Sequence, residues 1–345
     1  MYLKSRQIYL FFFISIFIAS CSNRKKVDVS NINLDLKIER FDQSMKELDQ
    51  TNLSVKAPQL QKQYGFFYND YMREMLNVGD PSDTSYYKNL RVVLQQKDYK
   101  ELSKTVDETF PDLNGVQNEL NDAFKHILYY YPKQKVPRLI SFLSGFTVQT
   151  PIGNDYIGIG LDMFLGSHSK FYPALIESIP AYVSRRFTPE NITPRVMEAF
   201  TREELFPEKD NSTTLLDKMI YNGKIMYFMD QVMPDLSDSL KIGYTSKQLQ
   251  WCKDYEGDIY GYFLDQNLLY ESDYMKIQGY LTEAPFTPEL GEKNESAPKL
   301  GVYIGWQIVK KYMQENPDIT VQQLMQDSDS QQILNKSRYK PKNAV

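Results

Sequence analysis

The sequence predicts an α+β fold that is mainly α-helical, with one small β-sheet or hairpin around residues 138–161. Over most of the 345-residue chain, apolar side chains recur every three and four residues, as on the buried face of a helix. One stretch from Arg138 onward alternates at period two instead. The composition is 42% hydrophobic and 24% charged with a formal net charge of -4, which is typical of a globular protein and argues against a nucleic-acid partner.

Residues 1–20 are typical of a lipoprotein signal peptide. A basic head with Lys4 and Arg6 precedes an apolar run over residues 8–18. This run is too short to span a membrane, since a spanning helix needs about 20 apolar residues. It ends in the letters IASC, which resemble a bacterial lipobox and imply acylation of Cys21. A plain cleaved signal, or a short anchor with an incidental cysteine, is the alternative.

Residues 21–36 are predicted to be the lipidated cysteine and a flexible tether, because the letters SNRKKVDVSNIN are polar and lack apolar periodicity. The basic residues 24–26 either contact anionic headgroups or are simply solvated. The other cysteine is Cys252, so a lipidated Cys21 leaves no intrachain disulfide. Residues 37–345 are expected to form a single folded domain, with N-terminal helices over 37–135 and a sheet-containing, helical core over 136–345.

Breaks in the helical pattern divide residues 36–135 at the turn Gly79-Asp80-Pro81 and around Pro111. Ser82 or Asp83 is expected to cap the helix after the first break.

The sheet is expected where Ile140, Phe142, Phe146 and Val148 alternate with small or polar residues. The turn PIGND follows, and then residues 156–161, in which glycines alternate with apolar residues as they do where another chain segment packs closely. Together these segments predict a hairpin.

Further helices are predicted at residues 172–186, 194–206, 213–232, 246–271 and 299–315. The second should begin with Thr193 as N-cap and Pro194 at its first position, and end before Pro207. In the last, glycines at 301 and 305 would let a neighbouring helix approach closely. A capping box formed by Thr320 and Gln323 should start one more helix.

Common catalytic motifs are missing from the sequence. Zinc sites usually need histidines at fixed spacing, but the two histidines, His126 and His168, lie far apart, and we expect both to be ordinary packed or surface residues. There is no G-x-S-x-G and no phosphate-binding loop. Carboxylate groups remain as candidates for glycoside hydrolysis, provided that two lie about 5 or 9 Å apart: Glu203, Glu204, Glu256, Asp258 and Asp265. The alternatives are solvated helix faces, or passive glycan binding on an aromatic surface.

Several segments in order between residues 138 and 341 resemble the gliding-motility lipoprotein family GldB of Bacteroidota, as does the lipobox. They are GIGLDMFLG, NGKIMYFMDQVMPDL, IGYTSKQLQWC, SAPKLGVYIGWQIVKKYMQENP and LNKSRYKP. The resemblance implies a membrane-anchored envelope lipoprotein needed for gliding, with a part in the associated type 9 secretion machinery as a further expectation. Its partners would be the membrane, through the acyl chains, and other envelope or motility proteins. Because no acidic run follows Cys21, we expect the protein to face the periplasm, with the choice of membrane left open.

That family is distantly similar to zinc peptidases of the zincin type, whose helix carries H-E-x-x-H. Laid against this motif, the letters MEAFT keep Glu198 and replace the histidines by Met197 and Thr201, while the third ligand falls at Asn222. Methionine, threonine and asparagine are poor zinc ligands, so Glu198 would have no zinc-bound water to activate.

The resemblance therefore predicts a zincin-like fold with a degenerate metal site at these four positions, without metal, cofactor or catalytic residue. The alternative is a core helix with no peptidase ancestry, and both interpretations predict no zinc peptidase activity. The other functions left open are a glycan- or peptidoglycan-binding lipoprotein and a hydrolase with a divergent zincin-like site.

Overall fold

The centre of the fold is a three-stranded parallel sheet in the order β1-β2-β3. The strands are β1 (Ile38–Arg40), β2 (Arg138–Phe142) and β3 (Tyr156–Gly160). The structure is a computed structural model that describes residues 26–49, 51–288, 290 and 295–342. The predicted signal peptide and Cys21 lie outside the described residues.

The described part of the chain contains sixteen α-helices beside this small sheet, so the prediction of a mainly helical α+β fold is confirmed. Two π-helical turns, Tyr71–Met75 and Thr201–Leu205, extend α3 and α8. The helices are α1 (Phe41–Lys46), α2 (Leu53–Tyr64), α3 (Phe66–Asp70), α4 (Tyr86–Gln95), α5 (Lys97–Thr109), α6 (Asn114–Tyr130), α7 (Ala181–Ser184), α8 (Ile192–Phe200), α9 (Leu215–Val232), α10 (Asp238–Ile242), α11 (Ser246–Asp254), α12 (Glu256–Asp265), α13 (Tyr274–Ile277), α14 (Leu300–Glu315), α15 (Val321–Gln326) and α16 (Ser330–Ser337).

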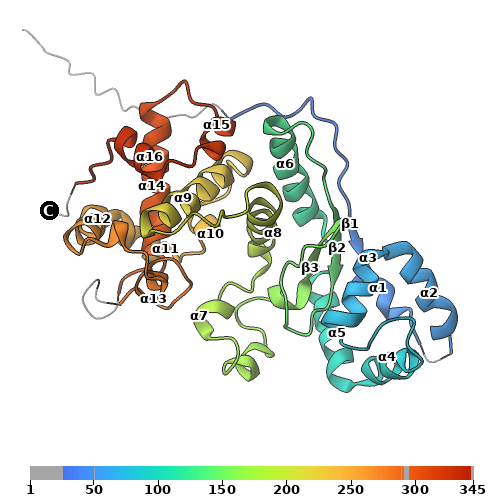
Figure 1. Ribbon diagram of the computed structural model, residues 1–345. Helices are drawn as coiled ribbons and strands as arrows, with labels where there is room; N and C mark the ends of the chain where they lie inside the picture. The colour runs from blue at the N-terminus through green and yellow to red at the C-terminus, as the bar shows by residue number, and fades with distance from the viewer. Residues whose placement is uncertain (1–25, 50, 289, 291–294, 343–345) are drawn as a thin grey trace, which may run out of the picture.

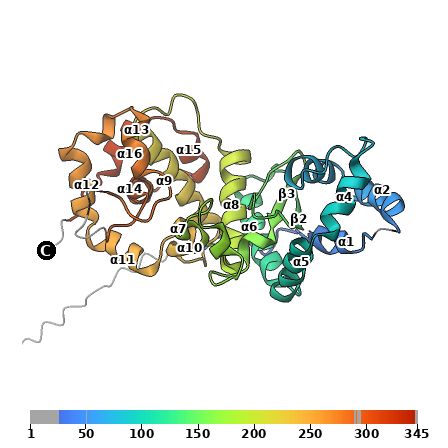
Figure 2. The same cartoon turned by 90° about the horizontal axis from the view of Figure 1, so that it is seen from below.

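The sheet separates two groups of helices (Figure 1). Helices α1–α5 lie on one side of it and α9–α16 lie at the far end of the molecule, with α6 and α8 in between, as the view from below also shows (Figure 2). Strands β2 and β3 are buried on both faces, as is usual for parallel sheets. Ile140 and Phe142 join the aromatic core of the N-terminal helices, while Leu139, Ile157 and Ile159 join the larger core around α9 and α14.

The predicted hairpin is corrected by the structure, because β2 and β3 run parallel. After Phe142 the chain turns through Gly145 and Phe146, whose φ angles are 66° and 63°, so the period-two pattern beyond Phe142 does not continue the strand. Residues 149–153 then return antiparallel along the outer edge of β3, where the amides of Gly158 and Gly160 each donate to a carbonyl 2.8 Å away. A hairpin therefore exists, but the segment 149–153 forms it, and it closes the sheet edge to further strands.

Two predicted helices are divided in the structure, and one predicted helix cap is not formed. The segment 172–186 contains only a 3₁₀ turn and the four-residue α7, because prolines at 173 and 180 interrupt it. Residues 246–271 divide into α11, α12 and a 3₁₀ turn at 268–270. The helix α4 begins at Tyr86, and Asp83 accepts from the Asp80 amide instead of capping it.

The helix α8 begins two residues before the predicted start. Its N-cap residue is Asn191, so Pro194 is its third residue, and the Thr193 hydroxyl donates to Glu119 instead of capping the helix. The predicted end before Pro207 is confirmed, since the π-helical turn ends at Leu205.

The close approach expected at Gly305 is confirmed: a Cβ there would lie 1.9 Å from the carbonyl oxygen of Met219 on α9. The capping box of Thr320 and Gln323 at the start of α15 is also confirmed. Both features are set by short sequence motifs, which explains why the sequence shows them.

The last residues of the predicted tether lie against the folded domain. Val29 and Leu36 are buried, and the Leu36 amide donates to the side chain of Asn121 on α6 at 3.0 Å. Lys26 forms an ion pair with Asp235. Among the residues that the structure describes, no helix has the length and apolarity needed to cross a membrane.

Candidate functional site

The helix α8 has a buried face and a polar face, and Glu198 lies on the polar one. Val196, Met197 and Phe200 are buried on the side that packs against β3, α6 and α9. The Glu198 side chain is 21% exposed. Met197 therefore belongs to the core and does not lie beside the Glu198 carboxylate as a ligand would.

The guanidinium of Arg202 connects two of the four predicted positions. Its Nε donates to the Glu198 carboxylate at 3.0 Å, and its Nη2 donates to the side-chain oxygen of Asn222 at 2.9 Å. The Asn222 amide group donates back to the Lys218 carbonyl at 2.8 Å, which fixes its orientation on α9. Glu198 on α8 and Asn222 on α9 are thus brought together, and the Arg202 guanidinium joins them.

The Thr201 side chain, the fourth predicted position, is fully buried. Its hydroxyl has no hydrogen-bond partner among the described residues. It opens the π-helical turn in which the Phe206 amide donates to the Thr201 carbonyl at 2.9 Å. The wider turn carries Arg202, and π-helical insertions of this kind are frequent at functional sites.

A second carboxylate, Glu283, is held by Lys299 and Arg186. The Lys299 ammonium donates to Glu283 at 2.6 Å and to the Ile242 carbonyl at 2.7 Å. Arg186 forms an ion pair with the same carboxylate, and its side chain is only 8% exposed. Its guanidinium packs against Gly243, where a Cβ would lie 2.0 Å from Cζ, so only glycine fits there.

The two carboxylate groups and their partners influence each other electrostatically. Arg195 makes a 3.5 Å ion pair with Glu198, and its Nε and Nη2 donate to Gln149 at 3.2 and 3.1 Å. The positive charge of Arg195 also lowers the pKa of Glu283, and the positive charge of Lys299 lowers the pKa of Glu198. We call this group the charge network, and it consists of Glu198, Glu283, Arg186, Arg195, Arg202 and Lys299, with Asn222 at its edge.

Cations exceed carboxylates in the charge network, and the pKa values reflect this. Burial raises the pKa of Glu198, but Arg202, Arg195, Lys299 and Arg186 outweigh it and hold that pKa at about 2. Burial lowers the pKa of Lys299 to about 8, which Glu283 only partly offsets. Glu198 is therefore ionised at neutral pH, and its negative charge is already paired with cations.

The residues at the four predicted positions do not fit a zinc ion. Met197 lies in the core, the Asn222 oxygen accepts from Arg202, and the guanidinium lies where a metal would have to bind Glu198. An excess of positive side chains also opposes a divalent cation. Within the described ranges, no group of three His, Cys, Asp or Glu residues could hold a metal ion.

The other candidate residues lie outside the charge network. His126 is buried in α6, where its Nδ1 donates to the Asp122 carbonyl at 2.9 Å, and His168 is exposed. The Glu256 side chain is partly buried, and its carboxylate accepts from the hydroxyls of Tyr303 and Tyr339 at 2.9 and 2.8 Å, which indicates a structural role. The remaining predicted carboxylates are exposed: Glu203, Glu204, Asp258 and Asp265.

Sequence reasoning missed most of the charge network. Arg186, Glu283 and Lys299 lie in loops or at a helix start, far from α8 in sequence, and no local pattern connects them. The spacing of Glu198 and Arg202 was visible, because oppositely charged residues four apart on a helix usually meet.

A family model described as gliding motility protein GldB matches residues 22–341. No curated protein and no solved structure matches the chain.

Proposed function

The chain belongs to the GldB family of gliding motility proteins, and from this premise we propose that it is a lipid-anchored, non-catalytic part of the gliding apparatus that acts by binding other envelope proteins. The family predicted from the sequence is confirmed, and membership of this family supports an involvement of the chain in gliding motility.

The observation that carries the non-catalytic proposal is the position of the Arg202 guanidinium. It donates to Glu198 and to Asn222, the positions of the general base and of the third ligand in the zincin comparison. A general base must accept a proton near neutral pH. A carboxylate with a pKa of about 2, paired with guanidinium groups, is poorly suited to this task.

The anchoring proposal rests on the lipobox and on the family. The matched region begins directly after Cys21. Several acyl chains on this cysteine would hold the protein firmly on a membrane. We place the folded domain on the periplasmic side, where it would bind motility or type 9 secretion proteins.

The non-catalytic proposal is tested with Glu198→Asp in a gliding host that lacks its own copy of the gene. This substitution keeps the negative charge beside Arg202 but shifts the carboxylate, which would strongly slow a reaction that uses it as a base. We expect unchanged colony spreading at unchanged protein level. Glu39→Asp is the matched control, because Glu39 pairs with Arg138 elsewhere in the fold. Loss of spreading with Glu198→Asp alone, at normal protein level, would refute the proposal.

Two further measurements complete the test. Elemental analysis of the purified mature protein should find no stoichiometric zinc, and one zinc per chain would overturn the argument about Arg202. The variant Cys21→Ser should move the protein from the membrane to the soluble fraction and abolish spreading. Retention on the membrane would contradict lipid anchoring through this cysteine.

A further inference from the structure

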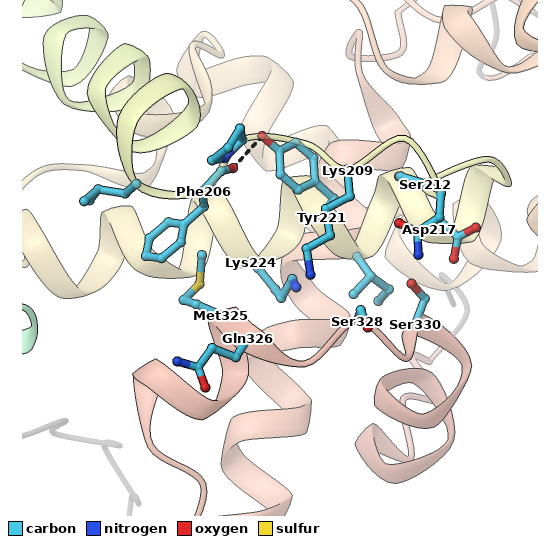
Figure 3. A pocket seen from close by; sticks show the side chains of 14 residues that line it. Phe206, Lys209, Ser212, Asp217, Tyr221, Lys224, Met325, Gln326, Ser328 and Ser330 are labelled. Carbon is cyan, nitrogen blue, oxygen red and sulfur yellow. Dashed lines mark hydrogen bonds between the residues drawn. The ribbon is translucent and has the colours of Figure 1, made fainter.

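A pocket of about 350 Å³ opens between three segments of the C-terminal half. One wall is the loop after α8, the floor is α9, and the other wall is the end of α15 with the first residue of α16 (Figure 3). The volume is in the range of small-ligand sites in proteins. Tyr221 lies between this pocket and the charge network, because its ring is 5.7 Å from the Arg202 guanidinium and its hydroxyl donates to the Phe206 carbonyl.

Two lysine side chains line the pocket. Lys224 reaches it from α9 and Lys209 from the loop, and in Figure 3 both side chains end between Phe206 and Met325 on one side and Asp217 and Ser330 on the other. The Lys224 ammonium donates to the Asp327 carbonyl at 2.8 Å, which uses one of its three N–H groups. The positive charge of Lys209 lowers the pKa of Lys224 in addition to burial. Among the residues that line the pocket, these two cations outnumber the one carboxylate, Asp217, and this excess of positive charge favours an anionic ligand.

The rest of the pocket separates into an apolar part and a hydroxyl part. Phe206 and Met325 lie on the side away from Asp217 (Figure 3), and Leu205 also lines the pocket. Ser212 lines the pocket, and its hydroxyl is buried with no partner among the described residues, so a donor is left for a ligand. Asp217 already accepts from the Thr214 amide and hydroxyl at 3.0 and 2.7 Å, and its charge opposes a doubly charged anion.

We propose that this pocket binds an organic carboxylate with an apolar substituent, its carboxylate between Lys224 and Lys209 and its apolar part against Phe206 and Met325. A single negative charge balances the excess of one positive charge that Lys224, Lys209 and Asp217 leave in the pocket, and the Ser212 hydroxyl can donate to it, while the mainly apolar wall matches the substituent. The chemistry fits two sources, the C-terminus of a peptide and a small organic acid. The proposal does not depend on the non-catalytic function, since none of these residues belongs to the charge network.

Binding is measured with the mature lipidated chain in lipid nanodiscs, using N-acetyl-L-phenylalanine and its C-terminal amide as probes. The acid should bind in a saturable way, and the amide at least roughly tenfold more weakly, because it lacks the charge that pairs with the lysines. A pentapeptide that ends in phenylalanine is compared with 3-phenylpropionate. Tighter binding of the pentapeptide points to a peptide C-terminus, and the reverse points to a small acid.

Variants locate the site. Lys224→Met keeps the length of the side chain and removes its charge, so it should weaken binding of the acid at least roughly tenfold, and Lys209→Met should weaken it less. The control is Lys218→Met on the same helix, because Lys218 pairs with Glu208 outside the pocket and should leave affinity within about twofold. Thermal unfolding checks that each variant is folded, and Lys209 is exposed, so its variant tests the site even if Lys224→Met unfolds.

The pH dependence gives an independent readout. Burial lowers the pKa of Lys224 to about 8. The charge of Asp327 partly offsets this shift, and the charge of Lys209 adds to it. Tyr221 and Asp217, on the same helix as Lys224, are the other titratable groups that line the pocket. A carboxylate binds the protonated lysine, so affinity should fall as the pH rises through about 8. The proposal is overturned if no probe acid binds up to about 10 mM, if acid and amide bind equally, or if Lys218→Met weakens binding as much as the pocket variants do.

Discussion

Replacing Glu198 by glutamine should lower the free energy of unfolding at pH 7 by about 3 kcal/mol, and the effect should disappear near pH 2. In the folded chain, burial alone would raise the pKa of Glu198, but Arg202 and the other cations of the charge network hold it at about 2. In the unfolded chain it returns to its ordinary value of 4.5. The difference of about 2.5 pKa units, at about 1.4 kcal/mol each, gives this magnitude.

The sign of the pH dependence follows from the lowered pKa. Above about pH 4.5 the carboxylate is ionised in both states, and the folded state gains the full interaction with the cations. As the pH falls from about 4.5 to about 2, the unfolded chain takes up the proton first, so the stabilisation is progressively lost. Because the Glu198 side chain is only 21% exposed, solvent screens this interaction less than it screens a surface pair.

The assay is urea unfolding of the soluble chain from residue 22 onward, followed by circular dichroism at pH 7, 5 and 3. Other carboxylates titrate in this range, and Glu283 is one of them. Burial raises the pKa of Glu283, but Lys299 and Arg186 outweigh burial and lower it. Only the difference between wild type and Glu198→Gln is therefore informative. Glu47→Gln, which removes an exposed pair with Lys56, should show no comparable difference. A difference that is small at pH 7, or the same at every pH, would refute the role assigned to the cations.

Three other substitutions test the packing and charge of the fold by thermal and urea unfolding at pH 7. Gly305→Ala should cost about 2–4 kcal/mol, because its Cβ would overlap the backbone of α9, and unchanged stability would contradict the close helix contact. Gly243→Ala should cost more than about 1 kcal/mol, since φ is 78° there and a buried guanidinium fills the space, whereas Gly261→Ala on α12 meets open space and should be neutral or stabilising. Asn222→Leu should cost about 1–2 kcal/mol at pH 7, because it removes the oxygen that accepts from Arg202 and the amide group that donates to the Lys218 carbonyl. Unchanged stability would contradict the contact between α8 and α9 through Arg202.

The sequence predicted features that depend on short motifs. The capping box at Thr320, the close helix contact at Gly305 and the bounds of α9 and α14 all follow from residues within one or two helical turns. The parallel sheet did not follow, because β1 has three residues, too few to show alternation, and pairs with β2 about a hundred residues further along. Strand direction depends on such distant pairing, so the pattern after Arg138 identified a strand but assigned the wrong partner.

The candidate site shows the same limit in another form. The comparison with H-E-x-x-H predicted which positions belong to the candidate site, and two of them, Glu198 and Asn222, do lie together. It could not predict that Arg202 joins them, because such a motif describes metal ligands and not the other side chains that contact these positions. Lys299 and Arg186 were invisible for a simpler reason, since they approach Glu198 only through folding of distant loops.

Under the proposed function, Arg202 takes over the structural part that a metal ion plays in holding two helices together. A metal ion held by two helices both fixes their distance and activates a bound water. A guanidinium can do the first, because its several N–H donors reach a carboxylate on α8 and an amide oxygen on α9 at once. It does not do the second, because it has no open coordination position and stays protonated at any physiological pH. Under the proposed function, the charge network therefore fixes the geometry of α8 and α9, and binding takes place on other parts of the molecule, of which the pocket at Lys224 is the first to test.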